Sequence, residues 1–80
     1  MYEPTMHKMV PMNSRVWIPW QHFGKPVSGT VVGISSYHDI FNYIILLDIS
    51  VPTPYGDIRA ASVPGTELVG IDGRNWKLDQ

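Results

Sequence analysis

Residues 41–49 constrain the fold of this chain more than any other segment, because apolar side chains occupy both sets of alternating positions. In a β-strand, alternation places one set on each face of the sheet. The first set is Phe41, Tyr43, Ile45, Leu47 and Ile49, and the second is Ile44 and Leu46. A half-buried strand needs only one apolar face, so the second face requires cover from the chain's own N-terminal arm or from another molecule.

The length and composition make this shortage of cover more severe. A chain of 80 residues is near the size at which folding buries only about 60% of the unfolded surface. Hydrophobic residues make up 44% of the chain and charged residues 16%, which is less charged than an average soluble domain. There is no cysteine, so disulfides and thiolate zinc sites are excluded. Small domains without such supports usually need a partner.

Charge and hydropathy disfavour two kinds of partner. The net charge is −1, and tight binding to a phosphate backbone needs a clustered basic face. No apolar run has the length of a membrane span, and the N-terminus lacks the apolar centre of a secretory signal. We therefore expect no membrane, and a location in the cytoplasm or within a soluble assembly such as a virion. The basic residues are scattered along the chain: Lys8, Arg15, Lys25, Arg59, Arg74 and Lys77.

The chain divides into an N-terminal arm, residues 1–13, and a β domain, residues 14–80. Pro4 and Pro11 prevent a continuous helix in the arm. Asp72-Gly73 predicts a type I′ hairpin that folds residues 75–78 back on the preceding strand. A tight turn with 3₁₀ character is expected at 63–66. The five expected strands span residues 15–18, 27–35, 41–49, 57–62 and 67–71.

This order of strands, loops and turns resembles the SH3-like small barrel, the architecture of KOW and Tudor modules and of a small peripheral photosystem I subunit. The resemblance covers about residues 14–71 and is one of topology, carried by residues 15–18, 29–34, 43–47 and 63–68. It implies an all-β, five-stranded SH3-like barrel with an extended arm and a C-terminal hairpin. Because one fold hosts many functions, the resemblance implies little about activity.

One enzyme family shares that fold, the type II dihydrofolate reductases, which are tetramers of small barrels around a pore. The family carries a Val-Gln-Ile-Tyr run on a pore-lining strand. The comparable stretch here, residues 56–59, keeps only Ile58. The activity is therefore not transferred, although an oligomeric barrel that binds a small ligand stays open as an alternative.

Aromatic residues in two loops form the candidate binding site. In the expected topology, the loops after the first and second strands meet at one end of the barrel. Trp and Tyr are common energetic anchors of interfaces. The opposite interpretation, in which Trp20 and Phe23 plug the barrel end, is equally compatible with the sequence. The predicted binding residues are Trp20, His22, Phe23, Tyr37 and His38.

A second set of residues forms the candidate interface. Trp17 lies on the opposite side of its strand from Val16 and Ile18, and Ile44 and Leu46 form the second apolar face. Methionines of the arm are adaptable apolar anchors that suit docking on an irregular surface. The predicted interface residues are Met6, Met9, Met12, Trp17, Ile44 and Leu46.

Catalytic and metal sites receive little support. His7, His22 and His38 do not have ligand spacing, and exposed loop histidines are the more common case. The spacing of Met6, Met9 and Met12 also suits a soft metal such as Cu(I), but anchoring of the arm explains it as well. Neither a nucleophile elbow nor a phosphate-binding glycine loop occurs. We expect neither enzyme activity nor a cofactor.

The sequence thus predicts a non-catalytic module for protein–protein association. It would serve as a small subunit of a larger assembly, a homo-oligomer, or a small inhibitor or adaptor; shortness and lack of cysteine also suit a phage-encoded protein. The first alternative is a nucleic-acid module in which Trp20, Phe23 and Tyr37 stack on bases.

Overall fold

The computed structural model describes residues 9–19, 23–37, 40–74 and 76, and it leaves the side chains of residues 36, 37 and 40 undescribed. Its elements are β1 (Arg15–Ile18), β2 (Val27–Tyr37), β3 (Ile40–Thr53), β4 (Gly56–Pro64), the 3₁₀ turn η2 (Gly65–Glu67) and β5 (Val69–Gly70). The strands form one antiparallel sheet in the order β4-β3-β2-β1-β5. The prediction of an all-β fold with five strands is confirmed.

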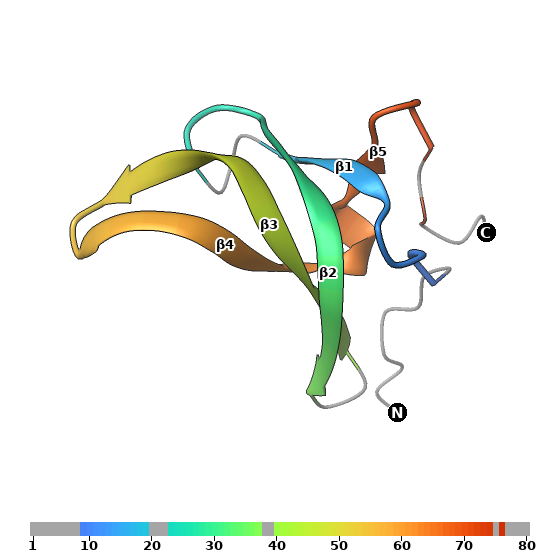
Figure 1. The fold of residues 1–80 in the computed structure, drawn as a ribbon. Coiled ribbons are helices and arrows are strands. Elements are labelled where there is room, and N and C mark those ends of the chain that lie inside the picture. The colour runs from blue at the N-terminus through green and yellow to red at the C-terminus, as the bar shows by residue number, and fades with distance from the viewer. Residues whose placement is uncertain (1–8, 20–22, 38–39, 75, 77–80) are drawn as a thin grey trace.

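The sheet is twisted but open. Within the described residues, β4 and β5 are its two edges, so the expected closure into a barrel is not observed. Figure 1 shows the β3–β4 hairpin extending to the left, away from β1 and β5. The 3₁₀ turn at Gly65–Glu67 connects the two edge strands, where the sequence predicts a tight turn.

One face of the sheet carries the core, and we call it the inner face. The alternation in residues 41–49 is confirmed at its centre, where Tyr43, Ile45 and Leu47 are buried. Phe41 and Ile49 belong to the same set but are exposed, because the first lies near the end of the β2–β3 hairpin and the second lies where the β3–β4 register shifts. The core consists of Val10, Val16, Ile18, Val27, Val31, Tyr43, Ile45, Leu47, Val51, Val63, Leu68 and Trp76.

Strand β3 is longer than the sequence predicts, since it continues through Pro52 to Thr53. A proline inside a sheet normally removes a ladder hydrogen bond. In β3, the pairing with β2 extends only to Leu47, whereas the pairing with β4 continues to Thr53. Pro52 therefore lies in a two-stranded stretch, where its missing N–H costs no bond to β2.

The turn after β5 differs from the predicted type I′ hairpin, which would need positive φ at both Asp72 and Gly73. Only Gly73 has positive φ, 89°. Gly73 N donates to Gly70 O and Gly70 N donates to Arg74 O, which is a type I turn followed by a glycine bulge. Asp72 Oδ1 accepts from Arg74 N at 3.0 Å, and this bond favours the type I turn. Of the predicted return strand, only Trp76 is described, and it is buried in the core.

The described part of the arm packs on the inner face. Val10 is buried there, and its N–H donates to the hydroxyl of Tyr43 at 3.1 Å. That hydroxyl in turn lies 3.6 Å from Met9 Sδ, to which it donates. Asn13 N donates to Val31 O, and Val31 N donates to Ser14 O. These bonds fix residues 9–14 to the sheet.

Replacing Tyr43 by Phe tests this attachment. The substitution leaves the buried N–H of Val10 without its acceptor, which costs about 1–3 kcal/mol. We expect urea unfolding to show that loss for Y43F and no more than about 0.5 kcal/mol for Y55F, because Tyr55 is fully exposed. An unchanged midpoint for Y43F would contradict the attachment.

Gly29 provides a second test of the packing at the centre of the sheet. A Cβ at this position would meet Ile45 Cγ2 and the backbone oxygen of Leu46 at 2.6 Å. We expect G29A to lose about 1–3 kcal/mol of unfolding free energy through overpacking. The matched control is G33A, where the nearest atom, Ile44 Cγ1, is 3.4 Å away; it should stay within about 1 kcal/mol of the wild type.

Candidate functional site

The outer face of the sheet, opposite the core, carries exposed apolar residues. Register places Leu46 between Thr30 of β2 and Ala60 of β4, and Trp17 beside Ser28. Leu46 is 50% exposed and Trp17 41%, whereas Ile44 is half-buried. The predicted second apolar face therefore exists, and no described residue buries its Leu46 or Trp17. The outer face is defined by Arg15, Trp17, Ser28, Thr30, Ile44, Leu46 and Asp48.

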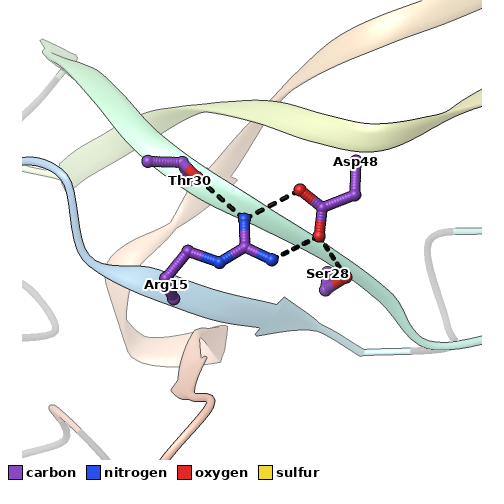
Figure 2. A network of polar contacts seen from close by, with 4 residues as sticks. All are labelled: Arg15, Ser28, Thr30 and Asp48. Carbon is purple, nitrogen blue, oxygen red and sulfur yellow. Dashed lines mark hydrogen bonds and ion pairs between the residues drawn. The ribbon is translucent and has the colours of Figure 1, made fainter.

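A polar network lies between Trp17 and Leu46 on this face. Arg15 on β1 donates from both terminal nitrogens to the carboxylate of Asp48 on β3, at 2.7 Å and 2.5 Å. Arg15 also donates to Thr30 Oγ1 at 2.8 Å, and Ser28 Oγ donates to Asp48. Figure 2 shows these four side chains on one side of the sheet, with Arg15 reaching across β2. The network joins three strands and holds the guanidinium in one orientation.

The network shifts the pKa of Asp48. Hydrogen bonds from Arg15 and then from Ser28 lower the pKa of the Asp48 carboxyl to about 2, against the opposing effect of lost hydration. The same hydrogen bond to Asp48 raises the pKa of Arg15 above its ordinary value. Both groups are therefore charged at neutral pH, and Asp48 is a poor proton acceptor there.

The arm does not cover the outer face in the described region. Val10 packs against the inner face, while Met9 and Met12 are 59% and 45% exposed. Residues 9–13 of the arm therefore leave Leu46 exposed, because the two backbone bonds to Val31 and the bond to Tyr43 direct them to the inner face. Met6 lies outside the described residues.

Three of the five residues in the predicted aromatic binding cluster lie outside the part of the chain that the structure describes. Trp20, His22 and His38 lie outside the described residues. Tyr37 is the last residue of β2, and its side chain is not described. Phe23 is half-buried and packs against the core. Its role in binding stays a prediction.

A small open pocket of about 320 Å³ lies beside the outer face. Trp76 and Gly70 contribute apolar surface, and Asp72 and Arg74 contribute charge. Sequence reasoning missed this pocket, because it depends on the buried position of Trp76 and on the bulged turn. Its lining residues are Ser14, Arg15, Gly70, Ile71, Asp72, Arg74 and Trp76.

Groups of three or more acidic, histidine or cysteine ligands do not occur in the described part of the chain, and all three histidines lie outside it. Within residues 9–19, 23–37, 40–74 and 76, no helix has the length and hydropathy needed to cross a membrane.

Comparison of the chain with protein-family models, with curated proteins and with solved structures gives no significant match.

The low pKa of Asp48 predicts a pH dependence of stability. The pKa of an unfolded aspartate is about 3.9, so ionised Asp48 stabilises the fold above about pH 4 and loses this effect as the pH falls toward 2. We expect the difference in melting temperature between wild type and D48N to be constant above about pH 4 and to vanish near pH 2. A difference that persists at pH 2 would show that the charge of Asp48 is not the cause.

Proposed function

We propose that the chain is a non-catalytic module for protein–protein association that docks through the outer face of its sheet. The observation that carries the proposal is the exposure of Leu46 and Trp17, 50% and 41%, on a face opposite a filled core. A surface that combines apolar side chains with an aromatic residue and an arginine has the composition of interface centres. The partner is a protein with a complementary apolar surface.

The arrangement of the outer face supports docking in a second way. Binding is weakened when side chains must be ordered on association. Arg15 is already held by Asp48 and Thr30, and Leu46 lies in the middle of a strand paired on both sides. Ala60 and Ser62 on β4, opposite Leu46 and Ile44, are small and leave the apolar side chains accessible. The face is thus preorganised.

The chemistry of the network favours binding over catalysis. An effective general base has a pKa near the working pH, whereas the pKa of Asp48 is about 2. The guanidinium of Arg15 is neutralised by the same carboxylate. This pairing also weakens the nucleic-acid alternative, because a paired arginine contributes little to phosphate binding.

We also propose that the chain is related to SH3-like barrels. The order of the five strands and the 3₁₀ turn between β4 and β5 support this relation. SH3-like barrels bind peptides and protein partners through their surfaces. An assembly subunit, an inhibitor and an adaptor are all consistent with such docking.

Capture from an extract of the cells that express the chain tests the proposal. We expect wild type to retain defined proteins and L46E to lose them, because a charge at the centre of the outer face must be desolvated on docking. The matched control is I34E: Ile34 is 41% exposed but lies opposite Tyr43 on the inner-face side. Melting temperatures measured for all three proteins establish that each is folded.

Salt and nuclease distinguish the two kinds of partner. Apolar docking should persist as salt rises and after nuclease treatment, whereas binding to a phosphate backbone weakens steeply with salt. Equal retention by wild type and L46E, or retention that disappears with nuclease, would refute docking through the outer face.

A further inference from the structure

The turn between β3 and β4 presents a tyrosine to solvent in a fixed position. Tyr55 is 100% exposed, at the second position of the two-residue loop between Thr53 and Gly56. Thr53 Oγ1 accepts from Tyr55 N at 3.1 Å and donates to Gly56 O at 2.6 Å. Pro54 restricts the backbone before Tyr55, and Gly56 has φ of 118°, which favours glycine. The loop is therefore rigid and its aromatic ring is free.

The pocket beside β5 has the properties of a site for one such side chain. Its volume of about 320 Å³ is at the lower end of the range for ligand sites, roughly 300–1,000 Å³. It therefore suits a side chain better than a large cofactor. Its floor is apolar: Trp76 is only 5% exposed, and its ring lies 3.2 Å from the position of a Cβ on Gly70. Ile71, 45% exposed, stands at its edge.

The charged groups of the pocket are suited to a phenol. The Asp72 and Arg74 side chains are 67% and 63% exposed, and Asp72 Oδ2 forms an ion pair with Arg74 Nη2 at 3.8 Å, which is longer than a hydrogen bond. Asp72 Oδ1 accepts from a backbone N–H, so Oδ2 is available to a hydroxyl donor. A guanidinium is attracted to the face of an aromatic ring. The pocket thus offers an acceptor, a cation and an apolar floor.

The tyrosine and the pocket lie at opposite ends of the molecule. In Figure 1 the β3–β4 turn is at the far left, and the segment after β5 is at the right; the molecule is 40 Å long. Tyr55 therefore cannot reach the pocket of its own chain. A contact between the two must join two copies, either head-to-tail or reciprocally in a two-fold dimer.

We propose that Tyr55 of one copy inserts into the pocket formed by Gly70, Ile71, Asp72, Arg74 and Trp76 of a second copy. Its ring packs on Trp76 and Ile71, its face meets the Arg74 guanidinium, and its hydroxyl donates to Asp72 Oδ2. Head-to-tail repetition of this contact gives a ring or a filament, and its reciprocal use gives a two-fold dimer. Arg15 belongs both to the outer face and to the lining of the pocket, but the contact does not use Leu46 or Trp17. It therefore neither requires nor supports the docking described above.

Sedimentation over a range of concentrations, up to about 1 mM, tests the proposal with two variants. Y55A removes the inserting ring, and I71R fills the mouth of the pocket with a further charged side chain. Both positions are exposed, so both variants should fold, which circular dichroism verifies. We expect wild type to self-associate, and each variant to weaken association by roughly tenfold or more. Y55F keeps the ring and should weaken it only a few-fold.

Mixing the two variants gives the decisive result. Y55A still has an open pocket and I71R still has Tyr55, so an equal mixture should form a dimer of one copy of each and nothing larger. A wild type that stays monomeric, a Y55A that assembles like wild type, or a mixture that stays monomeric would each overturn the proposal. L46E should self-associate as wild type does; if it alone loses association, self-association runs through the outer face and the insertion is refuted.

Discussion

The core lies on one face of a single sheet. The rest of the structure depends on this constraint. Alternation along β3 directs Tyr43, Ile45 and Leu47 into the core, and the neighbouring residues Ile44 and Leu46 necessarily point the other way. The described arm strengthens the inner face, because Val10 is buried there and binds the Tyr43 hydroxyl. That attachment directs this part of the arm away from the outer face.

The outer face holds a polar network in fixed positions and exposes apolar side chains beside it. The Arg15–Asp48 pair fixes the relative positions of β1 and β3 across β2, yet it leaves Trp17 and Leu46 accessible on either side. Because both charges are satisfied within the network, this part of the face presents less unpaired charge to a partner. Desolvation of a paired arginine and carboxylate is still costly, so the apolar residues around them supply the favourable part of docking.

The two proposed contacts use different physical means. Docking through the outer face depends on apolar area and preorganised strands, whereas insertion of Tyr55 depends on one aromatic ring and a pocket with matched polar groups. The first contact is open to any complementary protein. The second is specified by the chain itself, because the chain supplies both the exposed ring and the pocket. A subunit with both could link copies of itself and hold a separate partner.

Local patterns in the sequence determined the all-β class, most strand positions and the two-faced apolar character of residues 41–49, since alternation and turn residues act over short distances. They did not determine the open sheet, the inward path of Met9 and Val10, or the length of β3 through Pro52. Those depend on which strands pair and where pairing stops. Arg15 and Asp48 are far apart in sequence, and only the register of β1, β2 and β3 brings them together. The pocket likewise required tertiary packing of Trp76 against Gly70, because no local signal specifies what a buried indole will contact.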